Sequence, residues 1–198
     1  MPKARVLIVR TAGTNCDQET RYAFELAGAA VSLVHTKKLL AAPALLKDHH
    51  VFVIPGGFTY GDDIAAGRVL ANELRTLMQE ELIGHVRRGG LVLGVCNGFQ
   101  VLVKTGLLPG FSIVGTAPDD IAGGAEHARK PAGKGRDAGL PGQPLSQVAT
   151  LMFNDSNRYE DRWVYLKVCA GKSEFINRED AEIVYLPVAH GEGKFVPL

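Results

Sequence analysis

The chain has 198 residues, of which 46% are hydrophobic and 22% charged, with a formal net charge of +1 at pH 7. This length suits a single domain, 1–198, and the balanced charge gives no sign of a nucleic-acid or membrane partner. No apolar run approaches the roughly 18 residues of a membrane span, and the N-terminus is too weakly apolar for a secretory signal. Three widely spaced cysteines without a Cys-x-x-Cys pair argue against a disulfide framework or a metal site. We therefore expect a cytoplasmic protein.

Strands and helices alternate through the first half of the chain. Apolar, β-branched runs predict buried strands, and polar periodic stretches between them predict helices. The expected strands are residues 5–9, 31–35, 51–54 and 91–93. The expected helices are residues 17–26 with Asp17 as the cap, a weaker stretch over 38–47, and one long helix over about 67–88. This alternation predicts an α/β fold with an open, mostly parallel, doubly wound sheet.

The second half of the chain has a different character. Residues 109–147 contain eight glycines and five prolines, and we expect a flexible insert over about 117–147. Three further strands are expected at residues 150–153, 163–169 and 183–189. Short polar segments separate them, so we expect them to pair antiparallel at one margin of the sheet.

Cys96 lies between the short apolar strand at 91–93 and a following helical segment, within the pattern Gly94-Val95-Cys96-Asn97-Gly98. This pattern is the thiol counterpart of the hydrolase nucleophile elbow, in which glycines let the helix approach the strand closely. A cysteine at a helix N-terminus is favoured as a thiolate. We therefore predict that Cys96 is a nucleophile, the alternative being a buried, unreactive cysteine.

A cysteine nucleophile that transfers an acyl group needs donors for the developing oxyanion. The backbone N–H of Asn97 is one candidate. Gly56 and Gly57, which follow the preceding strand, offer the other, although Pro55-Gly56-Gly57 is also consistent with a simple turn.

The general base is less clear from the residues. His190 follows a strand and has Glu192 two residues later, so spacing favours His190 as the base with Glu192 behind it. The alternative is a polar turn that only borders the pocket. Cys16 also precedes a helix, but it lacks the flanking glycines and has Asp17 beside it, so we interpret it as a packing residue of the pocket.

Together these motifs resemble the class I glutamine amidotransferases, with their Gly-x-Cys-x-Gly-x-Gln elbow and upstream Pro-Gly-Gly. The similarity is greatest to the glutaminase subunits of phosphoribosylformylglycinamidine synthases, and it extends over nearly the whole chain. The matching segments are Gly13-Thr14-Asn15-Cys16-Asp17, Pro55-Gly56-Gly57-Phe58-Thr59-Tyr60-Gly61-Asp62, Gly94-Val95-Cys96-Asn97-Gly98-Phe99-Gln100, Gly106-Leu107-Leu108-Pro109-Gly110, Asn154-Asp155-Ser156-Asn157-Arg158 and His190-Gly191-Glu192-Gly193.

The resemblance implies a role in purine biosynthesis. The chain would hydrolyse glutamine through a thioester on Cys96, with oxyanion donors at Gly57 and Asn97 and with Gln100 helping to hold the glutamine. The ammonia would pass to a synthetase subunit that converts formylglycinamide ribonucleotide to its amidine, and a small accessory subunit would complete the complex. ATP and Mg²⁺ belong to the synthetase partner, so no cofactor is expected in this chain.

One family feature is missing from the 198 residues. The family keeps its catalytic His and Glu in a Met-Pro-His-Pro-Glu segment well after the His-Gly-Glu-Gly turn, and no such segment occurs here. We therefore expect a C-terminally shortened domain with little glutaminase turnover, in which Cys96 still reacts slowly. The alternative function is a non-catalytic partner subunit that keeps the fold without a working triad.

Overall fold

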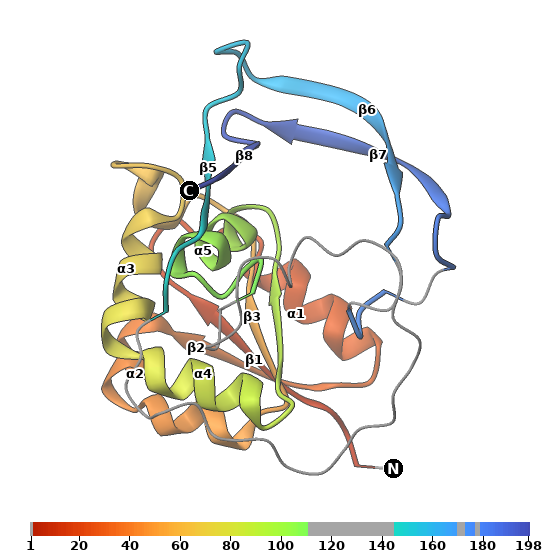
Figure 1. Cartoon of the computed structure of the whole chain (residues 1–198). Helices are drawn as coiled ribbons and strands as arrows, with labels where there is room; N and C mark the ends of the chain where they lie inside the picture. Colours follow the sequence, from red (N-terminus) through yellow and green to blue (C-terminus); the bar gives the residue numbers. More distant parts are fainter. Residues whose placement is uncertain (1, 111–144, 170–172, 177–178) are drawn as a thin grey trace, which may run out of the picture.

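The computed structural model describes residues 2–110, 145–169, 173–176 and 179–198, and it places a parallel sheet at the centre of the molecule (Figure 1). Four strands form this sheet in the order β2-β1-β3-β4, all parallel. Their bounds are Arg5–Arg10 for β1, Ala30–His35 for β2, Val51–Ile54 for β3 and Leu91–Gly94 for β4. The predicted strands of the first half are thus confirmed to within a residue.

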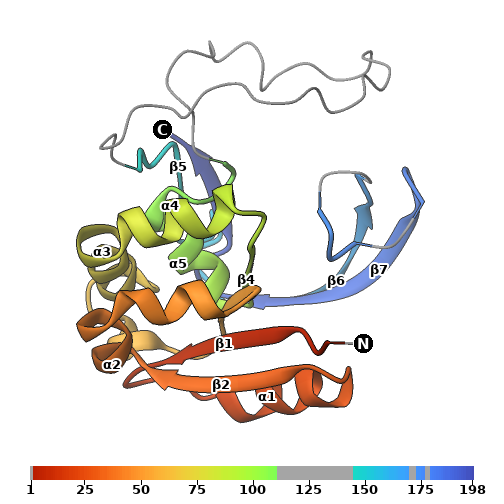
Figure 2. The ribbon, with the colours of Figure 1, turned by 90° about the horizontal axis from the view of Figure 1, so that it is seen from below.

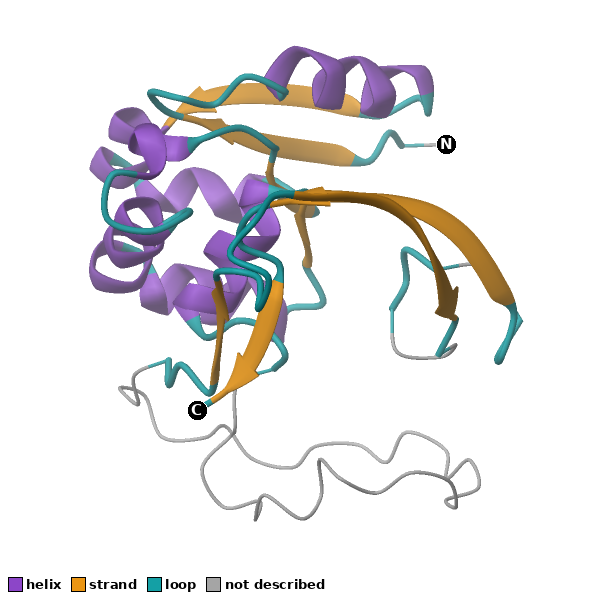
Figure 3. Cartoon of the chain, turned by 90° about the horizontal axis from the view of Figure 1, so that it is seen from above, coloured by secondary structure: helices purple, strands orange, loops and turns teal. Residues whose placement is uncertain are grey.

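Helices cover both faces of the parallel sheet, as the doubly wound prediction requires. Successive side chains of β1 point to opposite faces of the sheet, so the sheet divides the core into two parts. Val6 and Ile8 belong to the buried cluster on one face, whereas Leu7 and Val9 belong to the cluster on the other. Helix α1 (Asp17–Leu26) lies on the first face, and it is separated from the remaining helices by the sheet in Figure 3. Helices α2 (Thr36–Ala41), α3 (Arg68–Leu77), α4 (Gln79–Arg87) and α5 (Asn97–Thr105) lie on the opposite side of the sheet.

Three details of the predicted helices were wrong. Cys16 is the N-cap of α1, and Asp17 is its first residue, with a carboxylate 3.4 Å from the Arg10 guanidinium. The expected long helix is broken at Met78, whose backbone leaves the helical region (φ −134°) while its side chain is fully buried. The stretch 38–47 divides before Pro43, where α2 gives way to the 3-10 helix η1 (Pro43–Asp48), because proline cannot continue a helix.

The later strands pair antiparallel, as predicted. They form two separate two-stranded sheets: β5 (Ala149–Met152) pairs with β8 (Lys194–Pro197), and β6 (Glu160–Lys167) pairs with β7 (Ile183–His190). Strand β8 was not expected from the sequence. Figure 1 and Figure 2 show the β6–β7 ribbon extending away from the parallel sheet. The predicted insert at 117–147 lies outside the described residues except for residues 145–147.

Candidate active site around Cys96

Three loops meet where the parallel strands end. The loop 11–16 follows β1, and it pairs with the loop 55–62, which follows β3. Phe58 and Tyr60 donate backbone hydrogen bonds of 2.8 Å to the carbonyls of Gly13 and Ala12, and Cys16 donates one of 3.2 Å to Gly56. The third loop leads from β4 to Cys96. The carboxyl edge of a parallel sheet is where ligands bind in open α/β folds.

Cys96 lies on a strained turn between β4 and α5. Its φ of 53° and ψ of −114° are unusual for a residue with a side chain, and its side chain is exposed. The glycines on either side are required by close packing: a Cβ at Gly98 would lie 1.9 Å from the carbonyl oxygen of Ile54, and one at Gly94 would lie 2.5 Å from that of Gly98. The predicted nucleophile elbow is therefore present in its geometry.

Gly57 and Asn97 offer backbone N–H groups at this edge. Gly57 has a φ of 147°, and a Cβ there would lie 2.6 Å from the carbonyl oxygen of Gly13, so glycine is needed. Asn97 is the first residue of α5, where N–H groups have no partner within the helix. Within the described residues, neither N–H donates to a backbone carbonyl outside regular helices and strands. The oxyanion role of both groups stays a prediction.

Cys16 lies next to the elbow, in agreement with its interpretation as a packing residue of the pocket. A Cβ placed on Gly56 would lie 3.4 Å from the Cβ of Cys96 and 3.5 Å from the Sγ of Cys16. Desolvation raises the pKa of the Cys16 thiol, and the nearby carboxylate of Glu19 raises it further. Cys16 therefore keeps its proton more firmly than an ordinary cysteine.

The Asn97 side chain connects the elbow to the loop that follows Gly57. Its Oδ1 accepts hydrogen bonds from the backbone N–H and the hydroxyl of Thr59, at 3.2 and 2.8 Å. Its Nδ2 donates to Asp62 Oδ1 at 3.1 Å and to Gln100 Oε1 at 3.2 Å. Asp62 and Tyr60 both have positive φ values, so these contacts hold a strained loop in place.

Gln100 extends this network to the His-Gly-Glu-Gly turn. Its Nε2 donates to the backbone carbonyl of Glu192 at 2.9 Å, while its Oε1 accepts from Asn97. The Glu192 carboxylate accepts from the backbone N–H of Ala66 at 3.3 and 3.4 Å. The side chain of Gln100 thus joins α5 to the His-Gly-Glu-Gly turn.

His190 is oriented by Asn154 rather than by Glu192. One ring nitrogen, Nδ1, lies 3.0 Å from Asn154 Oδ1, and Asn154 Nδ2 donates to the His190 carbonyl at 2.8 Å. Glu192 points to Ala66 instead, so the structure does not pair these two residues as base and orienting acid. Asn154 was missed as an organising residue, although it lies in one of the motifs that carry the family resemblance.

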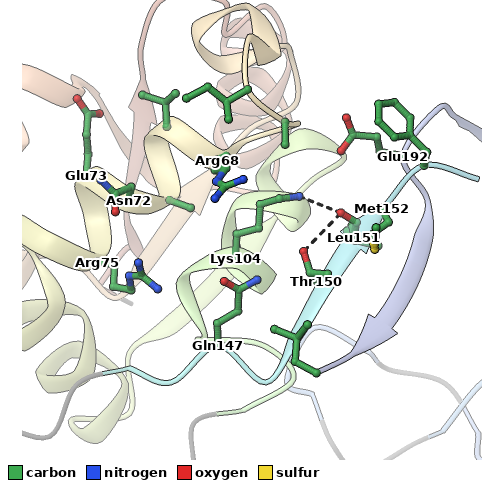
Figure 4. Close-up of a pocket in the computed structure, with 16 residues that line it drawn as sticks. Arg68, Asn72, Glu73, Arg75, Lys104, Gln147, Thr150, Leu151, Met152 and Glu192 are labelled. Atoms are coloured by element: carbon green, nitrogen blue, oxygen red, sulfur yellow. Dashed lines mark hydrogen bonds between the residues drawn. The ribbon is translucent and has the colours of Figure 1, made fainter.

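A cavity of about 750 Å³ lies beside this network, lined mainly by residues of α3, α5, β5 and the loops around them (Figure 4). Arg68, Lys104 and Glu192 are among its polar lining residues, whereas Gly56, Gly57 and Cys96 are not part of the lining. Burial lowers the pKa of the Lys104 ammonium group, which donates to the carbonyl of Leu151 at 3.2 Å. Lys104 thereby links α5 to β5.

Two further searches of the described residues gave no site. No group of three or more His, Cys, Asp or Glu side chains there is arranged to hold a metal ion. Among the helices that the structure describes, none has the length and apolar character to cross a bilayer.

The parallel α/β fold with a cysteine on a glycine-flanked strand-to-helix elbow defines the class of protein: an amidotransferase-like domain with an exposed thiol at the carboxyl edge of its sheet. The profile of the CobB/CobQ-like glutamine amidotransferase domain matches residues 3–128 and 133–197. The chain therefore belongs to the family of CobB/CobQ-like glutamine amidotransferase domains.

Individual relatives agree with this assignment. The chain is 44% identical over 198 residues to a phosphoribosylformylglycinamidine synthase subunit PurQ from Dehalococcoides mccartyi, covering 99% of this chain and 64% of the relative. It is 37% identical over 195 residues to the subunit of that name from Treponema denticola, covering 98% and 64%. The solved structure of PurLQS from Thermotoga maritima matches with a TM-score of 0.68 and 28% identity, covering 100% of this chain and 71% of that one. The chain thus spans less than two thirds of the length of these two curated relatives.

Proposed function

We propose that this chain is a glutaminase that forms a thioester between Cys96 and the side-chain acyl group of glutamine. The observation that carries the proposal is the exposed Cys96 on its strained elbow, beside the Gly57 loop, at the carboxyl edge of the sheet. The relatives support it, because they are named as PurQ subunits of phosphoribosylformylglycinamidine synthase and the chain belongs to a glutamine amidotransferase family.

The residues of this chain would act in a defined order. The Cys96 sulfur attacks the amide carbon, and the carbonyl oxygen becomes an oxyanion that accepts hydrogen bonds from the N–H groups of Gly57 and Asn97. The carbon–nitrogen bond then breaks, and the nitrogen leaves as ammonia with the proton that the Cys96 thiol has lost. Water later hydrolyses the thioester to glutamate and the free Cys96 thiol. Gly56 keeps the space beside the sulfur open, and Gln100 holds the loops that border the glutamine.

The proposed use of the ammonia lies on a partner. A synthetase subunit, with ATP and Mg²⁺, would convert formylglycinamide ribonucleotide to its amidine, and a small accessory subunit would complete the cytoplasmic complex. The subunit names of the relatives support a multi-chain enzyme.

The thioester itself provides the test. The chain is mixed with glutamine, quenched in acid and digested, and the Cys96 peptide is weighed by mass spectrometry. We expect a glutamyl adduct on Cys96 that is absent from Cys96→Ala and present in Cys169→Ala, the matched control.

With the synthetase partner and ATP, Cys96→Ala should still support amidine formation from ammonium chloride but not from glutamine. Glutamine-dependent synthesis by Cys96→Ala would refute the proposal.

A further inference from the structure

Two thiols that are far apart in the sequence flank a single glycine. A Cβ on Gly56 would touch both cysteines, at 3.4 Å from the Cβ of Cys96 and at 3.5 and 3.6 Å from the Sγ and Cβ of Cys16. These are ordinary van der Waals distances. The gap between the two side chains is therefore no wider than the space that one methyl group would fill.

Small molecules can reach the two thiols that border this gap, because both cysteines are exposed although Gly56 between them is buried. The side chain that would fill the space between them is absent because residue 56 is glycine. Each cysteine is an N-cap, at the junction between a loop and a helix. Loop backbone can shift more easily than the interior of a helix or a central strand. The pair therefore has both access to an oxidant and room to approach.

We infer that Cys16 and Cys96 form a reversible disulfide when the protein meets a peroxide, and that this bond switches off the nucleophile. A disulfide brings the two Cβ atoms to about 3.5–4.5 Å, which the pair reaches by closing the gap beside Gly56. The inference goes beyond the proposed function, because the bond can be detected whether or not the chain hydrolyses glutamine.

The chemistry takes place in two steps, with a peroxide as the two-electron oxidant. The Cys96 thiolate attacks one peroxide oxygen, the oxygen–oxygen bond breaks, and the departing hydroxide takes a proton to become water, leaving a sulfenic acid on Cys96. The Cys16 sulfur then attacks the Cys96 sulfur, and the sulfur–oxygen bond breaks. The hydroxyl group leaves with the Cys16 proton as a second water. Two sulfurs have each lost one electron, and a dithiol reverses the change.

The two cysteines have different parts in this sequence. The strained elbow holds Cys96 at the start of α5, where its exposed sulfur can react with peroxide. Glu19 and Asp17 place negative charge near Cys16 and, with desolvation, raise the pKa of its thiol. Cys16 is thus the slower partner that resolves the sulfenic acid, and it protects Cys96 from irreversible oxidation to the sulfinic acid.

Peptide mapping of the peroxide-treated chain tests the inference. After free thiols are blocked, trypsin without reductant should release one cross-linked species, which joins the peptide 11–21 containing Cys16 to the peptide 89–104 containing Cys96. A dithiol should separate the two peptides and return both free thiols. Cys169→Ser is the matched control and should give the same cross-link, since Cys169 lies in another part of the chain.

Two variants separate this bond from incidental oxidation. In Cys16→Ser, the cross-link should disappear and Cys96 should accumulate as sulfinic acid that a dithiol cannot restore. In Gly56→Ala, the added methyl group occupies the gap, so the cross-link should form several-fold more slowly although both thiols remain. The inference is overturned if the wild-type chain yields sulfinic acid on Cys96 without the cross-link, or if Gly56→Ala forms it at the wild-type rate.

Discussion

At the scale of single residues, the distinctive reactivity of this chain should reside in Cys96. A diazoketone analogue of glutamine should label Cys96 and leave Cys16 and Cys169 unlabelled, because Cys96 combines exposure with a helix N-terminus and a glycine-flanked elbow. Intact-mass measurement should show one adduct per chain, and Cys96→Ser should show none. Labelling of Cys16 in that variant would contradict the assignment.

The oxyanion role of Gly57 can be separated from its role in folding. Gly57→Ala places a Cβ 2.6 Å from the Gly13 carbonyl oxygen and shifts the loop that carries the N–H. Loss of one oxyanion donor typically lowers a rate by about 10²–10³, and we expect thioester formation to slow by that factor. Gly28 also has a positive φ, of 86°, but open space around it, so Gly28→Ala controls for a strained glycine replacement away from the site and should keep the wild-type rate. A Gly57→Ala chain with the wild-type rate would remove Gly57 from the site.

The residue scale also shows what sequence reasoning could and could not supply. Cys96 and its glycines were predictable because the elbow is a local motif, and its geometry depends on residues that are adjacent in the chain. The sequence placed Cys16 in the pocket, but its direct approach to Cys96 and the partners of His190 were not predictable. They depend on how separate loops meet: Cys16 reaches Cys96 across Gly56, and His190 meets Asn154.

At the scale of elements, the close contact between α5 and the end of β3 depends on Gly98, which has no side chain. Gly98→Ala would place a Cβ 1.9 Å from the Ile54 carbonyl oxygen, which is backbone and cannot rotate away. We expect a loss of about 3 kcal/mol in the free energy of unfolding. Gly84→Ala in α4 is the matched control: its Cβ meets the flexible end of Arg88, so a gain of about 0.5–1 kcal/mol in helix stability should result. Urea titration measures the free energy of unfolding of both variants. Equal changes in the two variants would argue against the close packing at Gly98.

The packing of α4 on β4 should make stability depend on pH through His85. This side chain is buried, its Nε2 lies 3.1 Å from the Leu91 carbonyl oxygen, and desolvation lowers its pKa. Unfolded histidine titrates near pH 6.5, so below that pH the unfolded chain binds more protons than the folded one. His85 therefore stabilises the fold fully above about pH 6.5, and this contribution declines as the pH falls.

The urea midpoint at neutral and at mildly acidic pH measures this effect. The midpoint should be lower at mildly acidic pH than at neutral pH. This difference should be smaller in His85→Gln, which keeps a donor for the Leu91 carbonyl but cannot be protonated. A decrease of the same size in both proteins would show that other groups cause the acid sensitivity.

Element types followed from the sequence better than element boundaries did. The β-branched runs of β1 and β3 are local signals, and their strands were predicted correctly. The break at Met78 was not predictable, because nothing in the helical pattern of residues 67–88 marks an end. It depends on the burial of Met78 in the core. Strand β8 was missed because its identity depends on pairing with β5, which is distant in the chain.

At the scale of the whole molecule, the parallel sheet and the β6–β7 ribbon differ in how they are stabilised. The sheet is covered by helices on both faces, whereas the ribbon is two-stranded and exposes Trp163, Tyr165 and Tyr185. The rings of Tyr165 and Tyr185 stack with their centroids 4.6 Å apart, and the ring centroids of Trp163 and Tyr185 are 5.0 Å apart. Such ring contacts contribute about 0.5–1.5 kcal/mol each, and an isolated two-stranded ribbon is marginal in water.

We therefore expect the chain to unfold in two steps, with the ribbon first. Trp163 is the one tryptophan of the chain, so its fluorescence reports on the ribbon, while far-ultraviolet circular dichroism reports mainly on the helices that cover the sheet. In a urea titration the fluorescence midpoint should precede the dichroism midpoint. Tyr185→Ala, which removes both ring contacts, should move the fluorescence midpoint lower still and leave the dichroism midpoint in place. Coincident midpoints in the wild-type chain would show that ribbon and sheet unfold as one cooperative unit.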